Sequence, residues 1–141
     1  MSLDPKFKVS EFPSQISNEF LNEIYNLNQE HIPEVGSLSS IEYLQELIEL
    51  SSNNFYISFE NNIIGFMICF RERSEYESKN YKFFTKNKSK FLYIDRIAIK
   101  SDFRRNGIGR SLYALISSIA IDKDIPLCCE VNTQPLNQIS I

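Results

Sequence analysis

The chain has 141 residues, a net charge of −3, and apolar and aromatic shares of 43% and 13%. This length favours a single domain over residues 1–141 with a core of its own, and the composition excludes a disordered chain. The mildly acidic balance argues against nucleic-acid binding through bulk charge.

Three cysteines, Cys69, Cys128 and Cys129, lie in apolar runs without CxxC spacing. An odd number in such surroundings indicates buried, reduced thiols and no metal site, which suggests a cytoplasmic setting. Residues 112–121, the most apolar segment, are too few to span a bilayer. The N-terminus has no apolar signal core. We therefore expect no membrane partner.

The first half of the chain predicts a short strand at 7–9 and two helices. Apolar residues recur at helical spacing through 15–28, which is typical of an amphipathic helix. A loop at 29–38 follows. Ser39 and Glu42 then have capping-box spacing, which predicts a second helix over about 40–51.

A hairpin and a long polar connection come next. Residues 55–60 alternate as a half-buried strand does, and 63–70 form the returning strand. Asn61-Asn62 tolerates positive φ and is the predicted turn. The polar stretch 71–90 contains Tyr76, Tyr81, Phe83 and Phe84. These aromatics favour an ordered lid, with a short helix at about 79–86. These aromatic side chains either line a pocket or only pack within the lid.

The last third predicts strand, helix and strand. Residues 91–99 read as a central strand, 107–122 as a helix and 127–131 as a second strand. Such a succession favours a parallel pair joined by a right-handed crossover. The predicted fold is α/β with a mixed sheet, in the order β-α-α-β-β-β-α-β.

The turn between that strand and helix reads RRNGIGR, and its members are Arg104, Arg105, Asn106, Gly107, Ile108, Gly109 and Arg110. The two glycines allow close backbone approach to a ligand, and the helix start offers unpaired N–H groups backed by the helix dipole. This combination predicts an anion site, for a phosphate or pyrophosphate. Glycines that serve turn geometry alone, or a basic nucleic-acid patch, are the alternatives.

Two motifs are excluded at this turn. Walker A requires GxxxxGK[ST], which does not occur. The dinucleotide fingerprint requires a third glycine where this chain has Leu112.

Charged residues in apolar strands form a second group of candidates. Asp95 and Arg96 interrupt the central strand, where charges are unfavourable unless paired or functional. They form a structural ion pair, or Asp95 binds or deprotonates an amine. Glu130, on the opposing strand, has the same two interpretations.

The loop after the first helix holds the only histidine, His31. A loop histidine is usually solvated or makes a local hydrogen bond, although its chemistry also suits a general base. The neighbouring Glu30 and Glu34 would attract a cationic amine.

These residues carry a family resemblance. RRNGIGR resembles the acetyl-CoA signature Q/R-x-x-G-x-G/A of the GNAT N-acetyltransferase superfamily, with Arg104, Gly107 and Gly109 at its defined positions. Further stretches, which extend the resemblance to essentially the whole chain, are similar to a bacterial subgroup of predicted GNAT acetyltransferases: EHIPEVG at 30–36, YESKNYKFF at 76–84, FLYIDRIAI at 91–99 and CEVNTQPLNQIS at 129–140.

The resemblance implies the GNAT acyl-CoA N-acyltransferase fold, with fourth and fifth strands that splay to admit pantetheine. It implies that acetyl-CoA pairs with backbone groups of Ile97, Ala98 and Ile99, and that its pyrophosphate sits on the turn at 104–110. Asn132 or Asn137 would bond the pantetheine.

It further implies acetyl transfer to a primary amine of a small molecule or amino acid. Asp95 and Glu130 are then the catalytic candidates. Glu30, His31 and Tyr81 are the candidates for substrate contact.

One departure from the family pattern concerns the end of the chain. GNAT proteins continue into a helix that often holds a tyrosine near the thiol, and then into two more strands, whereas this sequence stops at Ile141. We therefore expect a fold truncated after its fifth strand, whose exposed edge would favour a homodimer. A CoA-binding module without turnover is the alternative function.

Overall fold

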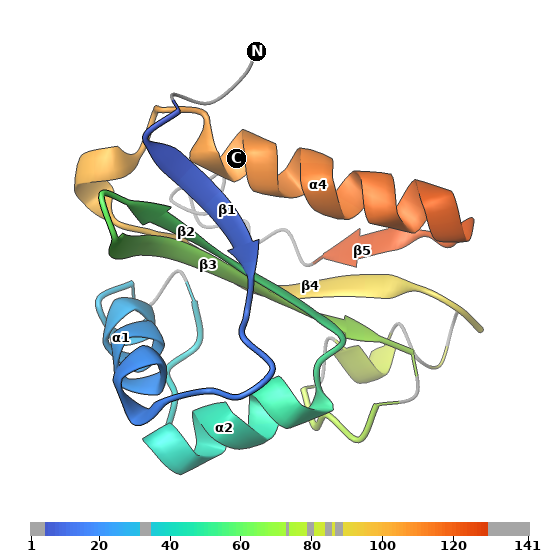
Figure 1. Cartoon of the computed structure of the whole chain (residues 1–141). Helices are drawn as coiled ribbons and strands as arrows, with labels where there is room; N and C mark the ends of the chain where they lie inside the picture. Colours follow the sequence, from blue (N-terminus) through green and yellow to red (C-terminus); the bar gives the residue numbers. More distant parts are fainter. Residues whose placement is uncertain are drawn as a thin grey trace.

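A computed structural model gives the arrangement of the chain. A mixed sheet separates two helical layers, with α1 and α2 on one face and α4 on the other (Figure 1). The structure describes residues 5–31, 35–72, 74–78, 81–83, 86 and 89–129.

The sheet has five strands in the order β1-β2-β3-β4-β5. The first three pairings are antiparallel, and β4 and β5 are parallel, as predicted for a pair joined by a crossover helix. The strands are β1 Phe7–Glu11, β2 Asn53–Phe59, β3 Asn62–Arg71, β4 Leu92–Ile99 and β5 Leu127–Cys129.

The helices are α1 Asn18–Gln29, α2 Ile41–Leu50 and α4 Ile108–Lys123, and a 3-10 turn, η1 Ser101–Phe103, precedes α4. Serine side chains cap the first two helices. Ser17 accepts a hydrogen bond from Phe20 N at 3.1 Å, and Ser40 accepts one from Tyr43 N at 3.1 Å. Each cap satisfies one N–H group that the helix leaves unpaired.

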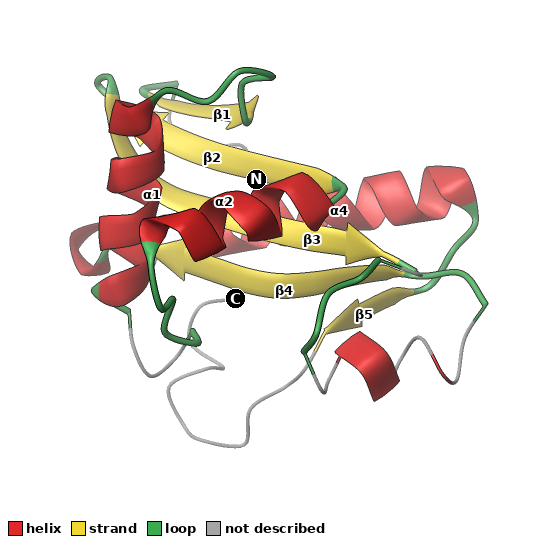
Figure 2. Ribbon diagram, turned by 90° about the horizontal axis from the view of Figure 1, so that it is seen from below, coloured by secondary structure: helices red, strands yellow, loops and turns green. Residues whose placement is uncertain are grey.

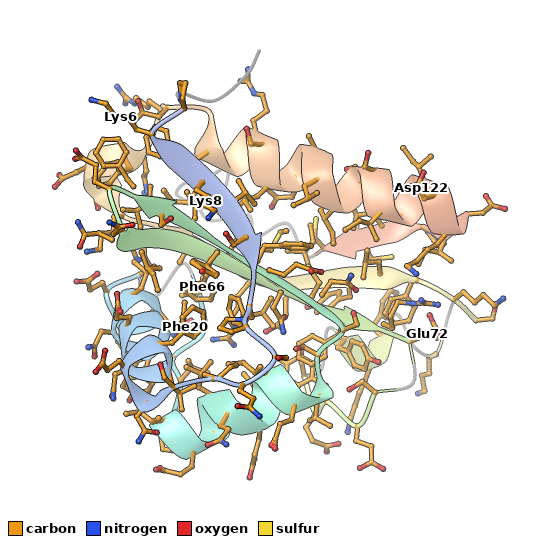
Figure 3. All side chains as sticks on the ribbon, viewed as in Figure 1. Lys6, Lys8, Phe20, Phe66, Glu72 and Asp122 are labelled. Atoms are coloured by element: carbon orange, nitrogen blue, oxygen red, sulfur yellow. The ribbon has the colours of Figure 1, made fainter. Side chains whose placement is uncertain are left out.

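Two apolar cores hold the layers together, one on each face of the sheet. Phe20 and Phe66 lie in the core beneath α1 and α2 (Figure 3). Ile108, Leu112 and Ile116 bury one side of α4 against the opposite face. Figure 2 shows α1 and α2 in front of the strands and α4 behind them. None of the helices in the described part of the chain is long and apolar enough to cross a membrane.

The predicted order of elements is confirmed, and two local predictions are wrong. Ser40, not Ser39, caps α2. The hairpin turns at Glu60 and Asn61, both with positive φ, because Phe59 already pairs with Asn62. The hairpin therefore starts its return one residue earlier than predicted.

The predicted lid at 71–90 is described only in part. Residues 81–83 form a helical turn, and Lys82 N donates to Ser78 O at 2.9 Å. The strand predicted to reach residue 131 is seen as far as Cys129, since residues 130–141 lie outside the described part.

Candidate active site

The turn that opens α4 leaves its backbone donors exposed. Gly107 occupies the N-cap position with φ 80° and ψ 10°, and no side chain of the described residues caps the helix there. Arg105 is also left-handed, with φ 74°. Successive turn residues of this kind point their N–H groups into one concavity, which is an anion-binding geometry. The helix start therefore keeps free the donors that Ser17 and Ser40 close elsewhere.

The surroundings of Gly107 fit an anionic group. Among the described residues, a methyl group on Gly107 would meet nothing within 4 Å, so these residues leave the space beside it open. No acidic residue lies in the first turn of α4. Arg105 precedes Gly107 and Arg110 follows it in the first turn of α4, and both are exposed. Positive side chains, a helix N-terminus and open space together suit a pyrophosphate such as that of CoA.

In the described part of the chain, the strand that leads to this turn has no neighbouring strand along the second half of one edge. β5 pairs with β4 only as far as Ile94↔Cys129 among the described residues. Lys100 N–H donates to Ile64 O on β3 at 2.8 Å, so the carbonyl of Ile99, in the same peptide unit, faces the opposite edge. By backbone alternation, the N–H and C=O of Ile97 face that edge as well. An extended ligand can pair there.

The three predicted backbone contacts are therefore not equivalent. The carbonyl of Ala98 points to β3, since a methyl group on Gly65 would lie 3.1 Å from its oxygen. The carbonyl of Ile99 accepts from His31 Nε2 at 2.6 Å. Donors and acceptors for a ligand at this edge come chiefly from Ile97 and from the N–H of Ile99.

His31 is buried, with 5% exposure, at the end of α1. Its Nδ1 lies 2.8 Å from Leu27 O and its Nε2 contacts Ile99 O. Both ring nitrogens therefore face backbone carbonyl oxygens of the chain, and the ring is directed away from open solvent. His31 makes local hydrogen bonds, as one interpretation of the sequence held, and joins α1 to the end of β4.

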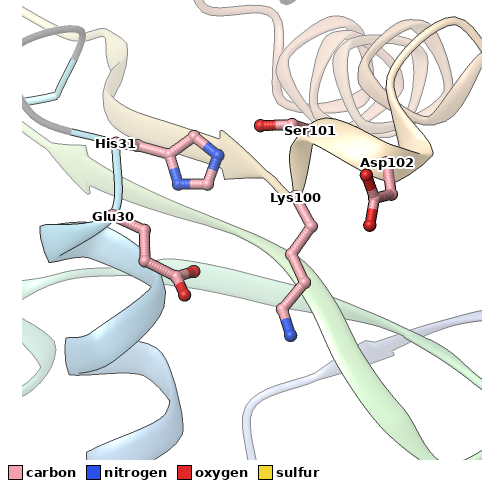
Figure 4. A pocket seen from close by; sticks show the side chains of 5 residues that line it. All are labelled: Glu30, His31, Lys100, Ser101 and Asp102. Atoms are coloured by element: carbon pink, nitrogen blue, oxygen red, sulfur yellow. The ribbon is translucent and has the colours of Figure 1, made fainter.

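A pocket of about 330 Å³ opens beside His31, between the end of α1 and the start of η1 (Figure 4). Glu30 and His31 form one wall, and Lys100, Ser101 and Asp102 form the other. Two of the three predicted substrate residues thus meet at one opening. Lys100 and Asp102 were not among the predicted residues. Their place directly after the central strand was the available signal.

Asp95 and Arg96 form the structural ion pair that the sequence allowed. Arg96 Nε donates to Asp95 Oδ2 at 2.9 Å, and the two side chains are only 7% and 6% exposed. The other carboxylate oxygen of Asp95 accepts from the Tyr76 hydroxyl at 2.7 Å. Each oxygen thus has one partner within the chain, and a catalytic role of Asp95 stays a prediction.

The Asp95 charge affects its two partners in a consistent direction. Burial, the Asp95 charge and its hydrogen bond raise the pKa of the Tyr76 hydroxyl far above its usual range, which keeps it protonated. Burial alone would lower the pKa of Arg96, but the Asp95 charge and its hydrogen bond raise it above its ordinary value. The triad therefore consists of a phenol, a carboxylate and a guanidinium.

Tyr81, the third predicted substrate residue, lies in the core. It is 1% exposed and packs against Phe70, Phe91 and Tyr93. Its hydroxyl accepts from Ser74 N at 2.6 Å and donates to Arg71 O. The position fits the lid-packing interpretation and does not expose the side chain to a substrate.

The remaining candidates, Glu130, Asn132 and Asn137, lie outside the described residues. Their roles stay predictions.

Comparison with known proteins decides the family. The sequence matches the acetyltransferase (GNAT) family over residues 21–141, which is most of the chain. The protein belongs to the GNAT acetyltransferase family. By this resemblance it is an N-acetyltransferase. A search of curated protein sequences finds no match.

Solved structures support the fold of this GNAT protein. A ribosomal-protein-alanine N-acetyltransferase from Brucella melitensis biovar Abortus 2308 is 14% identical, with a TM-score of 0.64 over 92% of this chain and 82% of that one. An aminoglycoside acetyltransferase, meta-AAC0020, from an uncultured soil metagenomic sample is 18% identical, with a TM-score of 0.62 over 94% and 82%. AAC(6')-Iy, solved with a bisubstrate analogue of CoA, is 16% identical, with a TM-score of 0.64 over 95% and 84%.

Proposed function

We propose that this GNAT protein transfers an acetyl group from acetyl-CoA to a primary amine of a small molecule. The observation that carries the proposal is the uncapped start of α4, where left-handed Arg105 and Gly107 expose backbone donors beside open space. Gly107 itself offers no side chain that could satisfy these donors at the N-cap. An anionic ligand accounts for their exposure.

Each part of the ligand has a counterpart in the chain. The turn at 104–110 would hold the pyrophosphate through its N–H groups and arginines. Ile97 and the N–H of Ile99 would pair with the pantetheine arm along the open edge of β4. Asn132 or Asn137 would add a side-chain bond to the arm. Bound acetyl-CoA supplies an acetyl thioester, an acyl donor that an uncharged amine can attack.

Charged side chains at the pocket beside His31 indicate what kind of acceptor it would take. Glu30 and Asp102 are exposed carboxylates at the pocket beside His31. They would attract the ammonium group of a substrate. Lys100 would favour a substrate that also carries a carboxylate or another hydrogen-bond acceptor. An acceptor ammonium must lose its proton before attack, and Asp95 or Glu130 would serve as the base. Among the structural neighbours, meta-AAC0020 is an aminoglycoside acetyltransferase, and AAC(6')-Iy was solved with an analogue that joins CoA to acetylneamine.

Calorimetric titration of acetyl-CoA into the protein, followed by a free-thiol release assay, tests the proposal. The assay panel contains an aminoglycoside, a polyamine and an amino-acid amide. We expect saturable binding with one site per chain, and thiol release with at least one amine. Absence of acetyl-CoA binding would contradict the proposal. Binding without thiol release from any amine would favour the alternative of a CoA-binding module.

A further inference from the structure

A bulge in β4 directs two consecutive charged side chains to the same face of the sheet. Ile68 pairs with Arg96 and Cys69 pairs with Ile94, so Asp95 has no partner on β3. Consecutive strand residues normally point to opposite faces, and an inserted residue cancels that alternation. Asp95 and Arg96 therefore both reach the layer that contains α1.

The guanidinium of Arg96 connects three segments beneath that layer. Besides Asp95, it donates from Nη1 to Asn28 Oδ1 at 2.9 Å and to Gly36 O at 3.0 Å. Asn28 Nδ2 also donates to Gly36 O at 3.0 Å. The connection thus runs from the bulge of β4 to the last turn of α1 and to the loop before α2.

A fourth segment joins through Asp95. Its carboxylate accepts from the hydroxyl of Tyr76, which lies in the connection between β3 and β4 and stacks on Phe70 with ring centroids 4.2 Å apart. Asn28, one of the partners of Arg96, lies two residues before Glu30, which lines the pocket beside His31. The network begins at Asp95, immediately after the last described pairing of β4 with β5.

We propose that Arg96 is a positioning residue for the acceptor, which fixes the Gly36 loop and the Tyr76 segment against the bulge of β4. The inference rests on the proposed function. Arg96 is only 8% exposed, so it acts through Asp95, Asn28 and Gly36 and not by contact with substrate. Its partners lie on the opposite face of the sheet from α4 and its turn, so its loss changes the acceptor side without changing the anion site.

Substitution of Arg96 by lysine tests this directly. Lysine keeps the charge beside Asp95, but a single ammonium cannot reproduce the planar fork that reaches Asn28 and Gly36 as well. With an amine that supports thiol release by the wild type, we expect the acceptor KM of Arg96→Lys to rise at least about 5-fold. We expect the acetyl-CoA Kd from calorimetry to stay within about twofold of the wild-type value.

Two further variants separate positioning from general loss of stability. Asn28→Leu removes one end of the connection and should raise the acceptor KM in the same way. Arg71→Lys alters a second arginine–carboxylate pair, Arg71–Glu72, at the end of β3, and should change neither constant. A smaller folded fraction lowers the measured concentration of sites but not KM, so the selective rise in KM is specific to positioning.

The outcomes are distinguishable. If Arg96→Lys and Asn28→Leu leave the acceptor KM unchanged, or weaken acetyl-CoA to the same degree, the inference is overturned while the proposed function stands. If the wild type binds acetyl-CoA but releases thiol with no amine, the proposed function and this inference both fail. A rise in acceptor KM in both variants, with constant acetyl-CoA affinity, supports the inference.

Discussion

The starts of α2 and α4 show two opposite treatments of the same backbone groups. At α2, Ser40 is extended and its hydroxyl closes an N–H group of the first turn. At α4, Gly107 is left-handed, no side chain caps the helix, and arginines surround the opening. A helix with only a structural role satisfies its first N–H groups with a capping side chain. A helix start that binds an anion leaves these N–H groups available for the ligand.

Glutamate at position 107 should have the largest effect on this contrast. In Gly107→Glu a carboxylate would compete with the phosphate for the same donors, and a side chain would occupy the open space. We expect acetyl-CoA affinity to fall at least about 100-fold, which corresponds to about 2.7 kcal/mol. The left-handed φ of 80° should reduce the free energy of unfolding by only about 1–2 kcal/mol. Calorimetry and chemical denaturation measure the two quantities.

Gly107→Asn is the matched control, because asparagine tolerates left-handed φ and adds no charge. It should retain much more affinity than the glutamate variant. Unchanged acetyl-CoA affinity in Gly107→Glu would show that the start of α4 does not bind the anion.

Neutralisation of Arg110 should have a smaller effect on binding. Arg110 is exposed in the first turn of α4, and a charged hydrogen bond contributes about 1.5 kcal/mol, so Arg110→Gln should weaken acetyl-CoA about 10-fold. Since exposed charges are screened by salt, wild-type affinity should fall as ionic strength rises, and less steeply in the variant. Titrations at two salt concentrations check this. Equal salt dependence in both proteins would contradict it.

A substitution at the capped start of α2 should lower stability and leave acetyl-CoA affinity unchanged. Ser40→Ala removes the hydroxyl that accepts from Tyr43 N and should cost about 1 kcal/mol of the free energy of unfolding. Acetyl-CoA affinity should not change. Ser39→Ala is a control at the neighbouring exposed serine and should leave stability nearly unchanged. Equal losses in the two variants would show that the cap is not the source of the effect.

The carboxylate of Glu72 satisfies a backbone N–H group, and its substitution should have the smallest effect on stability. It accepts from Phe91 N at 3.0 Å and pairs with Arg71. Although burial acts to raise its pKa, the bonds to Phe91 and Arg71 hold it below the ordinary 4.5. A lowered pKa stabilises the fold above pH 4.5, and this contribution is lost as the pH falls through the folded-state value.

Glu72→Gln should therefore flatten the pH dependence of unfolding in the acid range, by less than about 1 kcal/mol since Arg71 is partly exposed. Denaturation curves at neutral and acid pH measure the change. A variant that loses stability in acid as steeply as the wild type would contradict the assignment.

Sequence patterns predicted the elements well because each carries a strong local signal. Apolar periodicity marked the helices, and glycines with arginines marked the turn at 104–110. The choice between Ser39 and Ser40 depends on one backbone dihedral pair that composition does not specify. The hairpin turn likewise depended on register, which the adjacent polar residues 60–62 left open.

Parts of the site depended on contacts between distant segments and were less predictable. Arg96 was flagged as a charge in an apolar strand, but its partners Asn28 and Gly36 are 68 and 60 residues away. Asn28 did give a signal, since it lies one helical turn after Ile24 on the buried face of α1. The bulge at Asp95 gave none, because an inserted residue is visible only in the pairing of strands.

The most direct test of the anion turn compares acetyl-CoA with S-acetylpantetheine, which has the same arm and thioester but no pyrophosphate. Calorimetry on the wild type and on Gly107→Glu gives four dissociation constants. We predict that the wild type binds acetyl-CoA at least about 100-fold more tightly than S-acetylpantetheine, and that Gly107→Glu abolishes most of this difference. Equal preference for acetyl-CoA in the two proteins would contradict the assignment of the pyrophosphate to the start of α4.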